Sequence, residues 1–247
     1  MEWVKGTVVD VKHWTDSLFS IIVHAPIDPF IAGQFAKISL ELEGKKVQRA
    51  YSYVNSPKNK NLEFYLVTAK NGKLSQKLYS LKKYDSLMIS KKASGSFTLE
   101  RIPKFKNLWM ISTGTAIGPY LSILETEIGL EKFDNIFLVH AVRFFKDFSY
   151  LEKIEKFKKR YGEKLFFQPI VSREKVQNCL RGRIPDLIKK EVLQKITNSK
   201  IHYKNTHVML CGNPNMVKET EKLLKNSFRM KKNFFKNPGN ITTERYW

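Results

Sequence analysis

Apolar and polar residues alternate with a period of two through most of the first hundred residues. This alternation, interrupted by Gly, Pro, Asn and Asp at the turns, is typical of short β-strands that bury one face. One helix with apolar spacing interrupts the strands over residues 73–81. The predicted strands span residues 3–13, 18–24, 34–40, 47–54, 62–68 and 87–90, with Gly6 as a candidate bulge. Six closely spaced strands predict a small antiparallel β-barrel.

The hydrophobic pattern changes near residue 108. A continuous apolar run at 108–112 is expected of a parallel strand that is buried on both faces. Further strands are predicted at 136–141, 165–171 and 207–211, and helices at 120–128, 150–161, 185–193 and 214–230. Alternating strands and helices indicate βαβ units and a doubly wound parallel sheet. We therefore predict two domains, a β-barrel over residues 1–100 and an α/β domain over residues 101–247.

The predicted strand that ends at Val54 carries a distinctive set of side chains. Arg49, Tyr51 and Tyr53 are predicted to share one face, with Ala50 and Ser52 on the other. A guanidinium can bind phosphate, an aromatic ring can stack on a flat ligand, and small residues allow close approach. An amphipathic strand with aromatic residues in the core would show the same pattern. The strand alone therefore leaves both interpretations open.

Charge and cysteine content narrow the class of protein. The 44 Lys and Arg residues outnumber the 23 Asp and Glu residues, which gives a formal net charge of +21. Anionic partners would be attracted, but Lys, Asn, Ile and Phe also have A/T-rich codons, so charge alone assigns no partner. Two cysteines, Cys179 and Cys211, cannot build a disulfide framework or a four-cysteine metal site. We therefore expect no metal site. We also expect a cytoplasmic protein, because neither a signal peptide nor a membrane-spanning apolar run is present.

The start of the helix predicted at 73–81 is a candidate phosphate site. Free backbone N–H groups and the positive end of the helix dipole lie beside Lys73 and Ser75. Ordinary capping of the helix by Ser75 is the alternative interpretation.

The loop after the first strand of the α/β domain is glycine-rich. In open α/β sheets, ligands bind beyond the carboxyl ends of the strands. Gly114 and Gly118 in the sequence of residues 113–119 permit a tight turn and close approach of a ligand, and a helix follows. The spacing is not the Gly-x-Gly-x-x-Gly fingerprint, and glycine-rich turns between strands and helices are also common for structural reasons.

Basic residues follow the next two predicted strands. Arg143 comes after strand 136–141, Ser172 and Arg173 come after strand 165–171, and Arg183 comes shortly afterwards. Gathered at one sheet edge, these side chains would form a phosphate clamp. The 2′-phosphate of NADP fits such a clamp, because NAD-specific sites place a carboxylate near the ribose instead. Each arginine taken singly is better explained as a surface charge, and it is their common position at strand ends that favours the clamp.

Two further segments are candidates for ligand contact. Cys211 ends a predicted strand just before the turn formed by Asn213, Pro214 and Asn215, so its sulfur could border a ligand or simply pack as a small hydrophobe. The chain ends with Tyr246 and Trp247. Chain ends usually fray, and exposed aromatic side chains are unfavourable there. Stacking on a flat ligand or docking on the core would each explain why two aromatic residues end the chain.

Taken together, these motifs resemble the bacterial ferredoxin (flavodoxin)–NADP reductases. The resemblance covers essentially the whole chain in the family's order, and the set of motifs is far more specific than any one of them. It rests on residues 49–52, 114–119 and 211–214 and on the terminal Tyr246-Trp247, and residues 30–35, 47–48 and 183–185 also match.

The resemblance implies FAD bound noncovalently on the barrel, between the two domains. Arg49 would contact the pyrophosphate, Tyr51 would stack on the isoalloxazine, and Ser52 would hydrogen-bond near the reactive flavin nitrogen. Tyr246 would cover the other flavin face. The remaining FAD contacts implied by the resemblance are Ala50, Tyr65, Lys73, Leu74, Ser75, Thr115 and Trp247.

The resemblance also implies an NADP site on the α/β domain. Arg143, Ser172, Arg173 and Arg183 would hold the 2′-phosphate end of the nucleotide. Cys211 and the turn of Asn213, Pro214 and Asn215 would line the nicotinamide channel. Glu244 corresponds to a carboxylate that is thought to relay protons in plastid-type relatives. The catalytic set implied in this way is Ser52, Cys211, Glu244 and Tyr246.

The implied activity is electron transfer through FAD between NADPH, which gives a hydride, and ferredoxin or flavodoxin, which take one electron at a time. Ferredoxins and flavodoxins are acidic, so a basic surface would steer their docking. A monomer is expected, because the enzyme must dock and release its carrier. One alternative is an NADPH-dependent reductase of free flavin or quinone. A second is a basic nucleic-acid-binding protein, which the scattered basic residues and the lack of a nucleic-acid motif argue against.

Overall fold

The computed structural model describes residues 2–246. The chain up to Thr98, together with Gly118–Thr126, forms one compact unit. Leu99–Ile117, together with the chain from Glu127 onward, forms a second. The segment Gly118–Thr126 lies within the predicted α/β domain by sequence but packs with the first unit.

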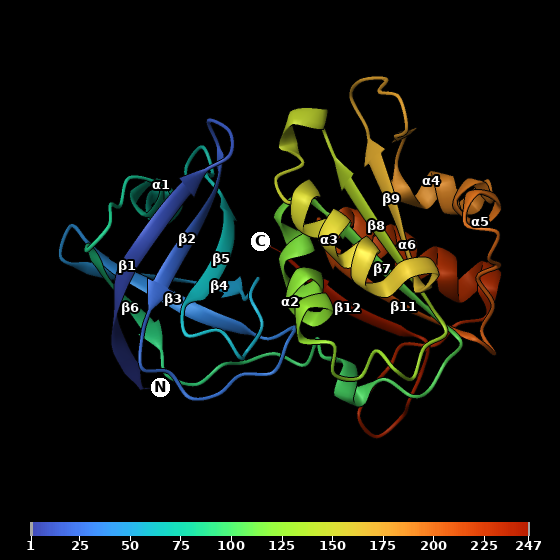
Figure 1. The fold of residues 1–247 in the computed structure, drawn as a ribbon, viewed down its shortest axis with the longest axis horizontal. Coiled ribbons are helices and arrows are strands. Elements are labelled where there is room, and N and C mark those ends of the chain that lie inside the picture. Colours follow the sequence, from blue (N-terminus) through green and yellow to red (C-terminus); the bar gives the residue numbers. More distant parts are fainter. Residues whose placement is uncertain (1, 247) are drawn as a thin grey trace. The chain divides into compact units, whose positions relative to one another are not determined.

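The first unit is built on a six-stranded antiparallel sheet with the order β4-β3-β6-β1-β2-β5 (Figure 1). A bridge between Tyr53 and Phe64 joins the two edges of the sheet, as a barrel requires. Its elements are β1 (Trp3–His13), β2 (Leu18–His24), β3 (Phe35–Leu42), β4 (Lys45–Ser52), β5 (Leu62–Val67), α1 (Lys73–Tyr79), β6 (Ser86–Ser90) and α2 (Gly118–Thr126). The predicted six-stranded barrel is therefore confirmed.

Inward-facing side chains from all six strands form the core of the barrel. Phe19, Ile21, Ile38, Phe64 and Ile89 are fully buried there. The alternation of apolar and polar residues placed these side chains inside, as predicted for strands that bury one face. The predicted bulge at Gly6 is wrong, because the register of β1 against β2 shifts between Val8 and Asp10 instead.

Gly6 is required by packing. A Cβ on this residue would lie 2.7 Å from Val23 Cγ1 and 3.2 Å from Leu87 Cδ1. The glycine thus lets β1 lie close to the buried side chains of two neighbouring strands.

The second unit contains a six-stranded parallel sheet with the order β10-β9-β8-β7-β11-β12. Its strands are β7 (Asn107–Thr113), β8 (Asn135–Val142), β9 (Leu165–Val171), β10 (Leu180–Arg181), β11 (Thr206–Gly212) and β12 (Ile241–Arg245). Its α-helices are α3 (Leu151–Tyr161), α4 (Ile184–Lys189), α5 (Val192–Ile196) and α6 (Pro214–Phe228). Short 3-10 helices are η1 (Leu99–Arg101), η2 (Gly114–Ile117), η3 (Phe145–Asp147) and η4 (Gly162–Lys164). The predicted parallel α/β sheet is confirmed.

Helices cover both faces of this sheet (Figure 1). α4, α5 and α6 pack on the face that carries Trp109, Phe137 and Ile170. Val142 and Val171 point to the other face, where they pack with residues that include Leu151 of α3. Burial on both faces explains why these strands read as continuous apolar runs in the sequence.

Three features of the second unit differ from the predicted elements. The helix predicted over residues 185–193 is two short helices, because Glu191 between them adopts a left-handed conformation with φ of 56°. The strands β10 and β12 were not predicted. β12 pairs in parallel with β11, so the segment just before the C-terminus is part of the sheet.

Across residues 2–246 no helix is long and apolar enough to cross a membrane. The same residues contain no group of three or more His, Cys, Asp or Glu side chains that could hold a metal ion.

Candidate functional site

Strand β4 presents a cation beside an aromatic ring. Arg49 is exposed, and its Nη1 donates to the main-chain oxygen of Gln48 at 2.7 Å. Tyr51 is half-buried, and this burial raises the pKa of its hydroxyl to about 12 despite the opposing charge of Arg49. Ala50 is exposed and Ser52 is buried. The phenol therefore stays neutral at physiological pH, so the tyrosine offers an aromatic face and a hydroxyl beside a positive charge.

Tyr53 follows the last residue of β4, and like Tyr51 it packs against the buried core of the barrel. β4 ends at Ser52, and the Tyr53 side chain is fully buried. Its ring stacks on Phe30 with centroids 3.8 Å apart and an interplanar angle of 17°. The stacked ring therefore belongs to the core of the barrel.

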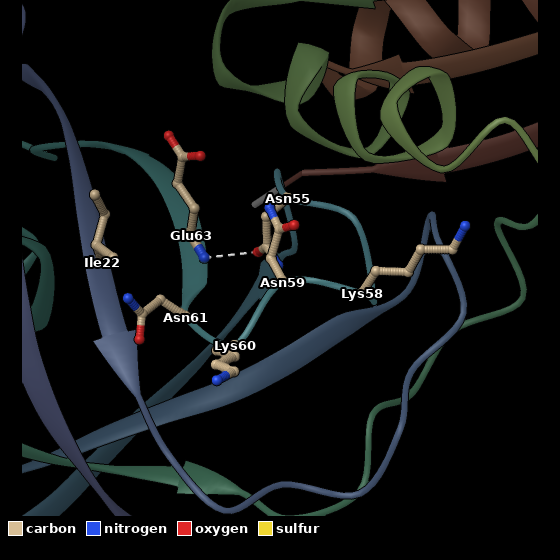
Figure 2. Close-up of a pocket in the computed structure, with 7 residues that line it drawn as sticks. All are labelled: Ile22, Asn55, Lys58, Asn59, Lys60, Asn61 and Glu63. Carbon is tan, nitrogen blue, oxygen red and sulfur yellow. Dashed lines mark hydrogen bonds between the residues drawn. The ribbon is translucent and has the colours of Figure 1, made fainter.

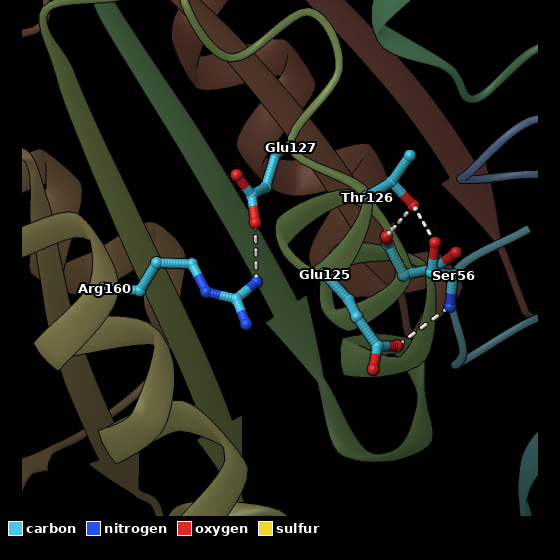
Figure 3. Close-up of polar contacts among 6 residues, drawn as sticks. Ser56, Glu125, Thr126, Glu127 and Arg160 are labelled. Atoms are coloured by element: carbon cyan, nitrogen blue, oxygen red, sulfur yellow. Dashed lines mark hydrogen bonds and ion pairs between the residues drawn. The ribbon is translucent and has the colours of Figure 1, made fainter. Parts of the chain in front are cut away.

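Helix α2 holds the chain that leaves β4 (Figure 3). Ser122 Oγ donates to the Asn55 carbonyl oxygen at 2.7 Å, and the Ser56 N–H donates to the Glu125 carboxylate at 2.8 Å. Thr126 Oγ1 lies 3.2 Å from Ser56 Oγ. These three polar residues of α2 were not singled out in the sequence, although their spacing of three and four places them on one helix face.

The start of α1 uses its polar side chains locally. Ser75 Oγ donates to the Gly72 oxygen and accepts from the Ala69 N–H, both at 3.0 Å. Lys73 Nζ lies 2.7 Å from Glu43, an exposed ion pair that lowers the pKa of that carboxyl. Leu74 is a buried core residue. Ser75 therefore stabilises the turn before α1, whereas the N-cap of the helix is Gly72, without a side-chain cap bond.

Tyr65 lies on the adjacent part of the same barrel. It is buried in β5, where it pairs with Ser20 of β2.

In the second unit, the strand order reverses between β7 and β11. β8, β9 and β10 follow β7 on one side, and β11 and β12 lie on the other. Open α/β sheets bind ligands at the carboxyl edge beside such a switch point. The residues that meet there are the glycine turn after β7 and the Gly212–Asn213 segment after β11.

The backbone of Gly212 passes close to Thr113 at this switch point. Gly212 has a φ of 125°, and a Cβ on it would lie 2.2 Å from Thr113 Oγ1. Thr113 Oγ1 in turn accepts from the Asn213 N–H at 2.9 Å. This bond fixes the two loop ends against each other.

Gly114 also has a left-handed backbone, with φ of 56°, but nothing lies within 4 Å of a Cβ added to it. Its carbonyl oxygen lies 2.9 Å from Nε2 of His140, a buried residue whose pKa is lowered to about 4 by burial. His140 is therefore neutral and holds the turn as a hydrogen-bonding residue. Thr115 is buried in η2 directly after this glycine.

Cys211, Glu244 and Tyr246 lie together at the ends of β11 and β12. Cys211 is fully buried and pairs in register with Glu244. Burial, with a smaller effect of the Glu244 charge, raises the pKa of the thiol well above its usual range, against a hydrogen bond with the Tyr246 side chain. The Tyr246 N–H donates to the Gly212 oxygen at 3.0 Å. The Cys211 thiol is therefore protonated. Trp247, the other aromatic residue predicted at this site, lies outside the described residues.

The predicted arginine cluster shares the carboxyl edge of the sheet. The Arg173 N–H donates to the Arg143 carbonyl oxygen at 3.0 Å, and Ser172 Oγ donates to the Val142 oxygen at 3.2 Å. Arg143 and Arg173 are exposed, and within residues 2–246 neither forms an ion pair. Arg183 is also at this edge, but it pairs with Glu219 of α6 at 2.8 Å. Two of the three arginines thus have uncompensated charge.

The turn after β11 is organised by Asn213. Its side-chain oxygen accepts from the N–H groups of Asn215 and Met216 at 3.0 and 3.2 Å, and Pro214 occupies the first turn of α6. Asn213 is therefore the N-cap of this helix. Its side-chain oxygen is committed to the helix, which the sequence pattern did not reveal.

A hollow of about 480 Å³ lies elsewhere on the first unit (Figure 2). Its lining is polar and includes Asn55, Lys58 and Glu63. Asn55 Oδ1 accepts from the Glu63 N–H at 2.7 Å, so the amide oxygen serves the chain itself. The hollow contains none of the predicted site residues.

Family models match both parts of the chain. Residues 17–98 match the oxidoreductase FAD-binding domain, and residues 110–222 match the oxidoreductase NAD-binding domain. The flavodoxin/ferredoxin–NADP reductase of Escherichia coli is 50% identical over 246 residues, which cover 100% of this chain and 99% of that protein. The protein of the same name from Buchnera aphidicola subsp. Baizongia pistaciae is also 50% identical, with 99% of each chain covered.

The chain belongs to the flavodoxin/ferredoxin–NADP reductase family. A crystal structure of a ferredoxin NADP⁺ reductase from Neisseria gonorrhoeae with bound FAD and NADP superposes with a TM-score of 0.93, at 29% identity and 99% coverage of both chains. A ferredoxin-NADP⁺ reductase from Plasmodium falciparum with 2′P-AMP has the same fold, with a TM-score of 0.73 and 18% identity over 98% of this chain and 95% of that one.

The residues of this reductase-family chain fit the two nucleotides. On β4, an exposed guanidinium stands beside a half-exposed aromatic ring, a donor set suited to a phosphate and a flat ring system. At the sheet edge, Arg143 and Arg173 provide two uncompensated charges, and Gly114 leaves open space where a side chain would stand. An anionic group with more than one charge suits this edge.

Proposed function

We propose that this protein is an FAD-dependent reductase that transfers electrons between NADPH and flavodoxin or ferredoxin. The observation that carries the proposal is the 50% identity to the E. coli and Buchnera reductases along the whole chain. The motifs at β4 and at the carboxyl edge of the parallel sheet lie within the matched length. Bound FAD would supply the conversion between two-electron and one-electron transfer.

In the first unit, the chain's own residues bind and orient the flavin. Arg49 neutralises pyrophosphate charge, Tyr51 presents its ring for stacking, and Ser52 donates a hydrogen bond to the ring system. Ala50, Tyr65 and the segment from Lys73 to Ser75 complete the FAD contacts. The neutral Tyr51 hydroxyl and the exposed Arg49 guanidinium support these roles.

In the second unit, the sheet edge binds NADP. Arg143, Arg173 and Ser172 hold the 2′-phosphate, and Arg183 adds charge once its pairing with Glu219 is relaxed. The turn of Asn213, Pro214 and Asn215 forms a wall of the nicotinamide channel. It does so with its backbone, because the Asn213 side-chain oxygen is already bonded as the helix cap.

Besides Tyr51 and Ser52, four residues are assigned roles near the reacting groups in this proposal. Thr115 contacts the flavin and the nicotinamide, and the Cys211 thiol lines the channel without ionising. Tyr246 covers the flavin face that NADPH must reach, so its displacement gates access. Glu244 is half-buried beside Cys211 and is assigned the exchange of protons with solvent. Trp247 is assigned the adenine side of FAD.

We further propose a cytoplasmic monomer. The formal charge of +21 would attract an acidic carrier, and a transient, salt-dependent encounter requires no second subunit. Size-exclusion chromatography with light scattering should return a mass near the chain mass of 28.9 kDa. A dimer mass at micromolar concentration would contradict this part of the proposal.

The test of the function begins with the purified protein. We expect it to be yellow and to release FAD on denaturation, with NADPH bleaching the bound flavin much faster than NADH. A protein that neither contains nor takes up FAD would overturn the proposal. Equal bleaching by NADH would overturn the assignment of the arginine edge to a 2′-phosphate.

A further inference from the structure

Helix α2 contacts the polypeptide directly after the flavin-binding strand, and it does so through polar groups. We propose that Ser122 and Glu125 are positioning residues. By fixing the segment from Val54 to Ser56, they keep the end of β4 in the position in which its side chains contact FAD. The inference rests on the proposed FAD site at β4 and assigns part of its geometry to a helix outside the barrel strands.

The two contacts act on main-chain atoms. Ser122 Oγ donates to the Asn55 carbonyl oxygen at 2.7 Å, and Glu125 Oε2 accepts from the Ser56 N–H at 2.8 Å. Asn55, Ser56 and Ser122 are 2%, 3% and 0% exposed, so the main-chain atoms of both bonds are shielded from water, whereas the Glu125 carboxylate is half-buried. A bond to the backbone fixes the path of the chain, whereas a bond to a side chain would fix only a rotamer.

The barrel holds the same segment from its other side. The Val54 N–H donates to the Glu63 oxygen at 2.9 Å, and the Tyr53 N–H donates to the Gln34 oxygen at 3.2 Å. Asn55 Oδ1 accepts from the Glu63 N–H. α2 supplies further restraints through Ser122 and Glu125, so removing either of them weakens the hold on this segment.

The fully buried residues between the anchor and the site transmit a displacement. Tyr53 and Val54 are 0% exposed, and they separate Asn55 from Ser52 by only two residues. Close-packed interiors shift as blocks instead of absorbing strain locally. A shift at Asn55 therefore reaches Ser52 and Tyr51, the residues proposed to contact the isoalloxazine.

α2 is also continuous with the glycine turn of the second unit. η2 ends at Ile117 and α2 begins at Gly118, where an added Cβ would lie 3.2 Å from Val54 Cγ2. The helix that starts at the nicotinamide turn thus contacts the exit of the flavin strand at its first residue and again at Ser122 and Glu125.

Four variants test the proposal in the full-length, FAD-loaded protein. Ser122→Ala and Glu125→Ala each remove a bond, whereas Glu125→Gln keeps an acceptor oxygen for the Ser56 N–H. Ser39→Ala is the matched control, because Ser39 is equally buried on β3 and its hydroxyl has no partner among the described residues. The readouts are the visible-region circular dichroism of bound FAD, its dissociation constant, the rate of FAD reduction by NADPH, and the thermal midpoint.

We expect Ser122→Ala and Glu125→Ala to alter the flavin circular dichroism and to slow reduction on the order of tenfold, as misplacement by a fraction of an ångström does. FAD should stay bound, and Glu125→Gln should recover the wild-type spectrum. A lower thermal midpoint with spectra and rates equal to those of Ser39→Ala would overturn the positioning role.

The outcomes separate this inference from the function on which it rests. If the wild-type protein binds no FAD, or NADPH does not reduce it, the proposed function fails. If wild type is active and both alanine variants match Ser39→Ala, only the positioning role fails. Should Ser122→Ala not fold, the comparison of Glu125→Gln with Glu125→Ala still decides the question.

Discussion

Two glycines at the switch point of the parallel sheet have left-handed backbones for different reasons. Gly212→Ala should lower the free energy of unfolding by roughly 3 kcal/mol or more, because its Cβ would collide with Thr113 in a conformation that already disfavours alanine. Gly114→Ala should lower it by only about 1–2 kcal/mol, since its Cβ meets open space. Urea unfolding of both variants measures the difference.

Gly114→Ala should nevertheless impair NADPH more than it impairs stability. The space that its Cβ would enter is the approach to the proposed nicotinamide site. We expect a higher KM for NADPH with FAD content unchanged. An unaltered KM would remove Gly114 from that site.

His140 makes the stability of the protein depend on pH. Its folded pKa is about 4 because of burial, below the ordinary value of 6.5, so between these values only the unfolded chain binds the proton. Stability is therefore fully present above pH 6.5 and is lost as the pH falls toward 4. The part due to His140 should amount to about 2 kcal/mol between pH 7 and pH 5.

The variant His140→Gln isolates this effect. Glutamine does not titrate, and its amide can reproduce the Nε2 contact to the Gly114 oxygen. Urea titrations at pH 7 and pH 5 should show a smaller loss of stability for the variant. A loss equal to that of wild type would assign the acid sensitivity to other groups, of which the buried His207 is the first to examine.

At the residue scale, the sequence predicted which side chains lie at the sheet edge better than it predicted which side chains they pair with. Arg143, Ser172 and Arg173 do meet at one sheet edge, because they follow adjacent parallel strands. The pairing of Arg183 with Glu219 depends on how α6 packs, which spacing along the chain does not encode.

At the scale of elements, α6 depends on its N-cap. Asn213→Ala removes the acceptor for two N–H groups and should cost about 1 kcal/mol of stability. Asn213→Asp keeps an acceptor oxygen at the same place, so its stability should stay near that of wild type. Thermal unfolding at pH 7 compares the two, and equal losses in both variants would mean that the cap bond does not matter.

Elements were predicted where local pattern determines them. β1, β2 and β9 begin and end at the predicted residues, because alternation or apolar content and turn residues bound them. β12 was missed because it is a five-residue strand at the sheet edge that follows α6 and the irregular segment 229–240, so no periodicity of its own marks it. The break at Glu191 was missed because its left-handed conformation is a tertiary outcome rather than a glycine signal.

At the scale of the molecule, the arginine edge should determine nucleotide preference. Arg143→Ala with Arg173→Ala removes the two uncompensated charges and should reduce kcat/KM for NADPH about 10- to 100-fold, the size expected for hydrogen bonds to a charged group. The value for NADH should not change. Arg160→Ala is the control, because this arginine lies on α3 and is paired with Glu127 at 2.8 Å (Figure 3). An equal loss for NADH would contradict the clamp.

Both folds of the chain could be derived from the change of hydrophobic period near residue 108, because period two and buried apolar runs dictate different sheets. The assignment of α2 to the first unit could not be derived from the sequence, since the helix follows a strand of the second unit. The partners of its polar face, Asn55 and Ser56, are known only from the structure. The net charge of +21 likewise does not identify an anionic partner, because that depends on the charge of the partner as well.

The most direct test of the central claim is sequential anaerobic electron transfer. NADPH is added in stoichiometric amount to the FAD-loaded protein, and oxidised flavodoxin or ferredoxin is then mixed with the bleached enzyme at low and at high ionic strength. We expect the flavin spectrum to return as the carrier is reduced, faster at low salt because the carrier is acidic and the reductase carries a charge of +21. A flavin that NADPH reduces but that neither carrier reoxidises would contradict the account.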